Sequence, residues 1–409
     1  MQSLRHKSAR WLARAGGAVG LVLSLGALTI AAPAVAGPAP LWIQQLGGTS
    51  YDNFEAVATD SAGNVVAVGR FGNADPWVVK FNAAGVVLWQ KKPGPAEAEQ
   101  ANGVAIDKND NVIVSATTGY PIDTWITKYN PSGGLVWTKR FDSGSNDFAY
   151  RVAVDGSGNV YTAGTNGPLA SSKKDAVLVK FNAAGVKQWS KVFGTDQLDE
   201  CNGIAVDKNN NILLVGTTYG PFAGPDPSAG RRDAWVAKLN GAGTFLWTKQ
   251  LDSLDADSDY GNAVAVDSNG NVVVGGRTQG RFKTTSARGS KAWLAKYSSG
   301  GVLTWIREYD PVGSYRDPAI LGLAVDSTGN VITTGRSYWF SSSKGSFIVK
   351  YNSAGTFLWE SLIDSGEGDS AQAVAVDRTG NPYVVGYTDG DLAAPNKGRN
   401  DAFLARFPK

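Results

Sequence analysis

The sequence predicts an all-β protein built from seven copies of one four-stranded unit. Of its 409 residues, 50 are glycine and only 18% are charged, a composition that suits short strands joined by tight turns. A segment of the form Asp-x-x-Gly-Asn, flanked by apolar runs, recurs seven times at intervals of 47 to 60 residues. Four-stranded units of this length are typical of propeller blades. We therefore expect a seven-bladed β-propeller.

Each repeated segment predicts the turn of a hairpin formed by the first two strands of a unit, strands A and B. Its aspartate can accept hydrogen bonds from nearby amides, and its glycine can adopt a positive φ. Asp110 and Asn210 replace the glycine in two copies, and both residue types tolerate that conformation. An asparagine follows four residues after each of the repeated aspartates, which are Asp60, Asp107, Asp155, Asp207, Asp267, Asp326 and Asp377.

A second hairpin follows in each unit and supplies strands C and D. In the first unit, residues 77–81 lead through an Asn-x-x-Gly turn at 82–85 into residues 86–89, which end in a tryptophan. The alternation of apolar and polar residues is typical of half-buried strands. The same pattern recurs at residues 128–137, 180–189, 238–247, 296–305 and 350–359.

The two ends of the chain complement each other. The last unit stops in its strand C, at residues 402–407, whereas residues 41–46 form a spare strand D. We expect this N-terminal strand to complete the seventh blade, because a closed ring leaves few unpaired strand edges. The tryptophans of strand D then also number seven, and we expect them to pack between blades rather than to bind a ligand. They are Trp42, Trp89, Trp137, Trp189, Trp247, Trp305 and Trp359.

The first 36 residues have the features of a signal peptide. Four basic residues precede an apolar stretch at 15–32, and Ala34-Val35-Ala36 fits the cleavage rule. We expect residues 1–36 to be removed, which leaves a propeller domain at 37–409 in a secreted, periplasmic or cell-surface protein. The alternative is that the stretch stays as a membrane anchor, since its length is borderline for a span. After cleavage no stable membrane insertion is expected.

The remaining composition excludes several kinds of chemistry. The segment 1–36 holds four of the 39 basic residues, which leaves 35 basic against 36 acidic side chains and gives no basic footprint for nucleic acid. It also holds His6, the only histidine. Catalysis by Ser-His-Asp or Cys-His systems and histidine-ligated metals are therefore excluded. Catalysis by two carboxylates stays open. The only cysteine, Cys201, cannot form an internal disulfide, and we expect it to be buried and inert.

Strand direction divides the loops between two faces. The B–C loops and the D–A connections lie on one face, and the two kinds of turn lie on the other. Variable loops on a rigid scaffold usually carry binding. We therefore expect any ligand on the B–C and D–A face, called the loop face below.

Seven carboxylates stand on the D–A connections, eight residues before each repeated aspartate, or nine in the sixth unit. In one interpretation each bonds the amides of its own loop. In the other they form an acidic ring that attracts cations. They are Asp52, Glu99, Asp147, Asp199, Asp259, Asp317 and Asp369.

The densest acidic run, at 252–259, suggests a possible calcium site. Asp255, Asp257 and Asp259 alternate as in the start of an EF-hand loop, but Tyr260 stands where glycine is needed and Val266 where glutamate is needed. A looser calcium site with oxygen ligands and a solvated acidic loop both remain open. The cofactors are otherwise unknown.

The long loops of the fourth and fifth units carry cations, among them Arg231 and Arg232, and an aromatic run in the sixth unit contains Trp339. Exposed aromatics beside cations suit acidic glycans or a protein partner. The alternative is that they pack against their own loops.

The repeated core Ala-Val-Asp-x-x-Gly-Asn-Val resembles the bacterial β-propeller repeat called SBBP, and the resemblance covers residues 41–407. It implies the propeller fold and an exported or surface protein. We therefore expect an exported binding or scaffold module with a protein or glycan ligand on the loop face. The alternative is a polysaccharide-active enzyme that uses carboxylates, or a calcium- and quinone-dependent enzyme. No catalytic residue is assigned.

Overall fold

The computed structural model describes residues 36–72, 75–94, 98–119, 122–168, 173–223, 230–255, 257–282, 289–310, 316–338 and 345–409, without the side chains of Arg316 and Tyr338. The chain divides into the units Met1–Pro33 and Ala34–Lys409. The predicted signal peptide lies outside the described residues except for Ala36. Among the described residues, no helix is long and apolar enough to cross a membrane.

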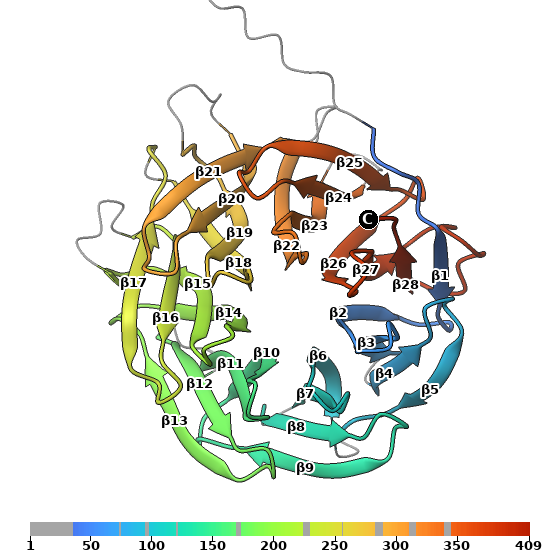
Figure 1. Cartoon of the computed structure of the whole chain (residues 1–409), viewed down its shortest axis with the longest axis horizontal. Helices are drawn as coiled ribbons and strands as arrows, with labels where there is room; N and C mark the ends of the chain where they lie inside the picture. The colour runs from blue at the N-terminus through green and yellow to red at the C-terminus, as the bar shows by residue number, and fades with distance from the viewer. Residues whose placement is uncertain are drawn as a thin grey trace, which may run out of the picture. The chain divides into compact units, whose positions relative to one another are not determined.

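Seven antiparallel sheets of four strands form a ring around a central channel (Figure 1), as the sequence predicts. In each sheet the strands lie side by side in the order A, B, C, D. The innermost strands, A, are β2 (Asn53–Thr59), β6 (Ala98–Ile106), β10 (Asp147–Val154), β14 (Asp199–Val206), β18 (Asp259–Val266), β22 (Arg316–Val325) and β26 (Asp369–Val376).

The other strands follow outward in the same way. The B strands are β3 (Val65–Phe71), β7 (Val112–Thr118), β11 (Val160–Asn166), β15 (Ile212–Thr218), β19 (Val272–Thr278), β23 (Val331–Tyr338) and β27 (Pro382–Thr388). The C strands are β4 (Asp75–Phe81), β8 (Thr124–Tyr129), β12 (Asp175–Phe181), β16 (Asp233–Leu239), β20 (Lys291–Tyr297), β24 (Ser346–Tyr351) and β28 (Asp401–Arg406). The D strands are β5 (Val87–Lys91), β9 (Leu135–Phe141), β13 (Lys187–Phe193), β17 (Phe245–Leu251), β21 (Leu303–Tyr309), β25 (Phe357–Ile363) and, for blade seven, β1 (Trp42–Leu46).

The N-terminal strand completes blade seven, as predicted. Strand β1 pairs antiparallel with β28, so that Trp42 lies opposite Arg406 and Leu46 opposite Ala402. The Gln45 side chain strengthens this pairing, because its Oε1 accepts hydrogen bonds from three successive amides at 392–394. The ring is thus fastened by both backbone and side-chain hydrogen bonds.

The tryptophans of strand D connect neighbouring blades, which confirms the packing role expected for them. The indole of Trp89 donates a hydrogen bond to the carbonyl of Pro131 in the next blade (3.1 Å), and Trp42 donates to Ala83 across the ring closure (3.3 Å). The glycine of each C–D turn lies against the tryptophan of the preceding blade. At Gly133, φ is +83° and a Cβ would lie 3.0 Å from Trp89. Both the turn and the contact therefore require glycine.

The A–B turns have the geometry that the sequence predicts. In blade one, Oδ1 of Asp60 accepts hydrogen bonds from the amides of Ala62 and Asn64, and the Asn64 side chain donates to Oδ2. Asp110 and Asn210 have φ values of +60° and +63°. The two turns that lack glycine therefore have the same left-handed backbone conformation at this position.

The hydrophobic core lies between neighbouring sheets, where alternate side chains of adjacent blades meet. Leu213 and Val236 of blade four, for example, share a cluster with Val272 and Trp293 of blade five. Cys201 is fully buried in the cluster between blades three and four. Burial raises the pKa of its thiol to about 12, so the residue is an inert core thiol, as expected.

We predict that Trp42→Ala lowers the free energy of unfolding by about 3 kcal/mol, the lower end of the range for buried tryptophans, because it removes the contact of β1 with blade one. Urea unfolding followed by tryptophan fluorescence measures the change. The rate of labelling of Cys201, the single thiol, should rise as the free energy of unfolding falls. The control Leu254→Ala, at an exposed site, should leave both the free energy and the labelling rate unchanged. Equal stability of Trp42→Ala and the wild type would contradict the proposed role of β1.

Candidate functional site

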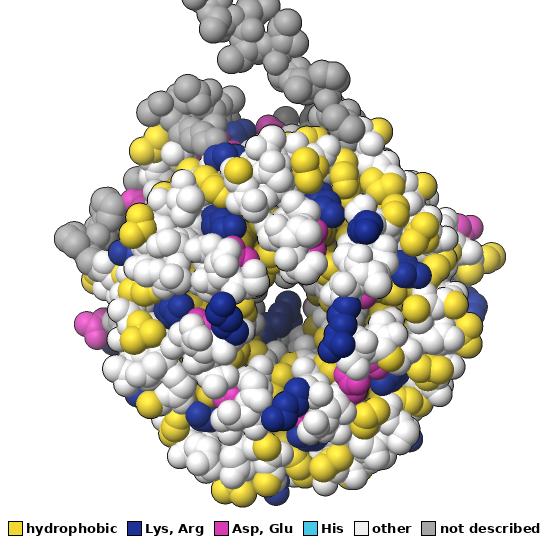
Figure 2. Space-filling view, in the orientation of Figure 1, with side chains coloured by type: hydrophobic (Ala, Val, Ile, Leu, Met, Phe, Trp, Pro, Cys, Tyr) yellow, Lys and Arg dark blue, Asp and Glu magenta, His cyan; other side chains and the backbone are white. Residues whose placement is uncertain are grey.

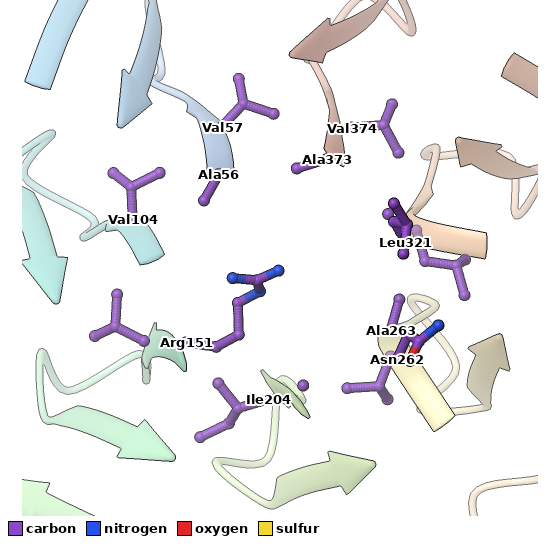
Figure 3. Close-up of a pocket in the computed structure, with 15 residues that line it drawn as sticks. Ala56, Val57, Val104, Arg151, Ile204, Asn262, Ala263, Leu321, Ala373 and Val374 are labelled. Atoms are coloured by element: carbon purple, nitrogen blue, oxygen red, sulfur yellow. The ribbon is translucent and has the colours of Figure 1, made fainter. Parts of the chain in front are cut away.

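The central channel narrows to a small pocket lined by the A strands. Its volume is about 160 Å³, and its walls are formed mostly by aliphatic side chains such as Val104 and Ile204. Arg151 is the charged residue of this lining, and its side chain extends toward the middle of the channel (Figure 3). Among the described residues that line this pocket there is no carboxylate.

Arg151 introduces a charge into this apolar lining and interacts electrostatically with Glu55. Nη1 of Arg151 donates hydrogen bonds to the carbonyl oxygens of Asn102 (2.7 Å) and Tyr150 (2.9 Å). Burial raises the pKa of Glu55, and Arg151, Arg70 and Arg336 oppose that shift in this order. Burial likewise lowers the pKa of Arg151, and Glu55 opposes this. The two side chains therefore stabilise each other's charged form.

The sequence analysis missed Arg151, although the repeat contains a signal for it. The other blades have alanine or glycine at this position, namely Ala56, Gly103, Gly203, Ala263, Gly322 and Ala373. The replacement of a small residue by a long cationic side chain in one copy is visible when the seven copies are compared.

Five of the seven predicted carboxylates bond the amides of their own loops, in agreement with the local interpretation. Each is at most 2% exposed, and each accepts a hydrogen bond from an amide four to six residues upstream. The pairs are Gly48 to Asp52, Ser143 to Asp147, Thr195 to Asp199, Ser253 to Asp259 and Ser365 to Asp369.

The remaining two carboxylates differ. Glu99 is exposed. Asp317 forms an ion pair with Arg277 of the preceding blade and has a φ of +63°. Strand β22 has an additional register shift at this point, between Arg316 and Ala319. That shift explains why Asp317 stands nine residues, rather than eight, before its repeated aspartate.

Burial dominates the titration of the enclosed carboxylates. It raises the pKa of Asp147, Asp199 and Asp369, and that of Asp259 to about 7. The cause in each case is desolvation, which the amide and hydroxyl hydrogen bonds only partly offset. These carboxylates lie inside the junctions between blades and are not exposed at the mouth of the channel.

The acidic run at 252–259 is divided between two environments. Asp255 pairs with Arg281 (3.1 Å), and Asp257 lies 3.9 Å from Arg231. Asp259 instead lies beside Asp233 and Asp252, with one carboxylate oxygen of each within 4.8 Å of the others. The grouping that could hold a cation is therefore different from the Asp-x-Asp-x-Asp set that the sequence suggested.

Arginines and tyrosines form a network on the loop face over blades four to six. The Arg232 guanidinium lies 4.8 Å from the ring centre of Tyr219 and donates a 2.7 Å hydrogen bond to the Tyr260 hydroxyl. On the same tyrosine, the Arg277 guanidinium lies 4.3 Å from the ring centre. Arg231 is exposed beside the network, whereas the predicted Trp339 lies outside the described residues.

Basic side chains also surround the channel in the space-filling view. Figure 2 shows lysines and arginines around the central opening and further basic atoms deeper within it.

The turn face carries a repeated ion pair that the sequence analysis missed. Nζ of Lys80, at the end of strand C, lies 2.8 Å from Oδ2 of Asp60 and 3.2 Å from the carbonyl oxygen of Pro131 in the next blade. The lysine recurs at the end of each C strand except the last, where arginine stands. The equivalent pairs are Lys128–Asp107, Lys238–Asp207, Lys296–Asp267, Lys350–Asp326 and Arg406–Asp377.

The fold defines the class of protein, a seven-bladed propeller with one uniform face and one variable face. The β-propeller repeat family SBBP matches residues 136–169, 188–223 and 246–283, so the chain contains SBBP repeats in blades two to five. It is also similar to an uncharacterized WD repeat-containing protein of Acanthamoeba polyphaga mimivirus, with 24% identity over 232 residues. The match spans 42% of this chain and only 16% of that relative.

Solved structures support the fold. The protein described as YCF48 bound to D1 peptide has a TM-score of 0.52 at 10% identity, covering 92% of this chain and 98% of that one. The polysaccharide lyase Uly1 has a TM-score of 0.52 at 11% identity, covering 88% and 92%. The two titles describe different activities, so this likeness establishes the architecture only.

The Asp60–Lys80 pair predicts a specific dependence of stability on pH. Burial tends to raise the pKa of Asp60, but the hydrogen bonds from Lys80 and Asn64 outweigh it and hold the pKa below 3.8. A depressed pKa contributes stability above the unfolded value, and this contribution is lost as the pH falls through the folded value.

Asp60→Asn should therefore cost about 3–5 kcal/mol at pH 7, because it leaves Lys80 buried without a counter-ion. The cost should shrink as the pH falls from about 5 to 3. Urea unfolding of both proteins across that range measures it. The double variant Asp60→Asn/Lys80→Met should lose less stability, and its difference from the wild type should also decrease at low pH. A cost that does not vary with pH would contradict the assignment.

Proposed function

We propose that the protein is an exported binding module that holds an acidic segment of a protein partner on its loop face. The observation that carries this proposal is the network of Arg232, Tyr260 and Arg277, which lies among the longest loops of the ring. Export is inferred from the signal-like segment at 1–36. The argument for binding rests on the chemistry of the network.

The network offers ready-made recognition of carboxylates. Arginine presents several donors in a planar fork that fits a carboxylate, and the stacked tyrosine limits the orientations of that fork. Because Tyr260 is placed between two arginines, little side-chain freedom is lost when a ligand binds. Arginine and tyrosine are also the residue types that most often dominate the energy of protein interfaces.

A protein segment suits this face better than a glycan does. The aromatic rings of Tyr219 and Tyr260 already carry arginine guanidinium groups, so they are less free to stack on sugar rings. The structural neighbour YCF48, described as bound to a peptide, provides a precedent for peptide binding on this architecture. A glycan as the ligand is a distinct outcome of the test below.

We predict that an acidic peptide library contains sequences that bind the protein, and that Arg232→Ala weakens their binding by about tenfold or more, as expected for loss of a charged contact at an interface. The matched control is Arg378→Ala, an exposed arginine on the turn face. Surface plasmon resonance with immobilised peptides measures both, and the affinity should fall with added salt.

A parallel array of acidic glycans separates the two ligand classes. Binding to peptides that depends on Arg232 supports the proposal. Binding to glycans only, or equal effects of Arg232→Ala and Arg378→Ala, would overturn it. Tyr260→Phe provides a second variant that keeps the ring while removing its hydroxyl.

A further inference from the structure

The junctions between blades repeat a three-part arrangement on the loop face. The start of strand C and the end of strand D of one blade meet the start of strand A of the next blade. Among the described residues, two junctions place three aspartates there, each with one oxygen within 4.8 Å of the others. They are Asp123, Asp142 and Asp147 between blades two and three, and Asp233, Asp252 and Asp259 between blades four and five.

The first of these junctions contains its own cation. Arg140, on strand D, donates to Asp123 (2.6 Å) and Asp142 (3.0 Å) through Nη2. The guanidinium thus lies between two of the three carboxylates and compensates their charge.

The second junction has glutamine at the equivalent position. Gln250 stands two residues before Asp252, as Arg140 stands two residues before Asp142. Its amide donates a 2.6 Å hydrogen bond to Asp233, which replaces the hydrogen bond of the arginine but not its positive charge. In both junctions, one oxygen of each of the three carboxylates lies within 4.8 Å of the others.

One oxygen of a buried carboxylate in this second junction lacks a hydrogen bond of normal geometry among the described residues. Asp259 is fully buried, and its Oδ2 accepts the amide of Ser253 (2.7 Å), whereas Oδ1 accepts no hydrogen bond of normal geometry from the described residues. Buried polar atoms nearly always have a partner, and an exception indicates an ion or a water. The exception here belongs to one of the three clustered carboxylates.

We propose that the junction between blades four and five binds one calcium ion through Asp233, Asp252 and Asp259, at the position that the Arg140 guanidinium takes between blades two and three. Oxygen donors favour a hard cation, and calcium accepts carboxylates together with carbonyl and water oxygens in a flexible shell of six to eight ligands. Magnesium keeps several of its own waters and demands a stricter octahedron, which an enclosed group of three carboxylates suits less well.

The ion would connect three strands that belong to two blades. It would hold the starts of β16 and β18 and the end of β17 together, and Tyr260 directly follows Asp259 in the chain. The site is therefore independent of the Arg232 network in its chemistry but adjacent to it in sequence.

Isothermal titration of the chelator-treated protein with calcium chloride tests the proposal. We expect one site per chain and a rise of the unfolding temperature with calcium concentration. Gln250→Arg, which supplies the missing guanidinium, should abolish binding while keeping the fold. Asp252→Asn should weaken calcium binding at least tenfold. This second variant keeps the test valid if Gln250→Arg does not fold.

The reciprocal change gives a gain of function. Arg140→Gln should create a second calcium site between blades two and three, so that the stoichiometry rises from one to two. Absence of calcium binding by the folded wild type, or binding that Gln250→Arg and Asp252→Asn both leave unchanged, would overturn the proposal. A wild type that binds magnesium and not calcium would overturn the choice of ion.

Discussion

The buried pair between the A–B turn aspartate and the lysine at the end of strand C is the interaction on which the ring depends. In blade one, Asp60 orders its own turn through two amides, and Lys80 connects that turn to strand C and to a carbonyl of blade two. One side-chain pair thereby joins the inner hairpin, the outer hairpin and the neighbouring blade. Because both partners are enclosed, neither can be lost without leaving a buried charge.

The tryptophans of the outer strands also connect neighbouring blades. Their indoles donate hydrogen bonds to carbonyl oxygens in the C–D turns of the next blade, the turns that the lysines also contact. Pro131, for example, accepts hydrogen bonds from both Lys80 and Trp89. All of these contacts lie on the turn face or beside it. These contacts recur in most of the blades. The loop face differs between blades, and it carries the Arg232 network, the acidic junctions and the long loops.

The fold was predictable from the repeat, because each hairpin is specified by residues that lie close together in the sequence. The spacing of Asp60 and its equivalents indicated the hairpins, and the missing last strand D indicated the pairing of β1 with β28. The site was less predictable, because it depends on which blades become neighbours. Asp259 gains its neighbours from strand C and strand D of the preceding blade, and Arg151 and Glu55, which come from different blades, influence each other's pKa. Arg151 is a departure in a single copy and the aspartate groups are found in two junctions, and an averaged repeat conceals both.

The pairing of β1 with β28 also determines the order of events during synthesis. The Gln45 side chain bonds the carbonyl of Gly390, 345 residues later in the chain, so the first strand to be made is among the last to find its partner. Local hairpins can form as soon as they are translated, but such a distant contact carries a large entropic cost and slows the final step. A nascent chain that is cut short before β28 would expose the edges of both β1 and β27, which makes truncated products candidates for aggregation and proteolysis.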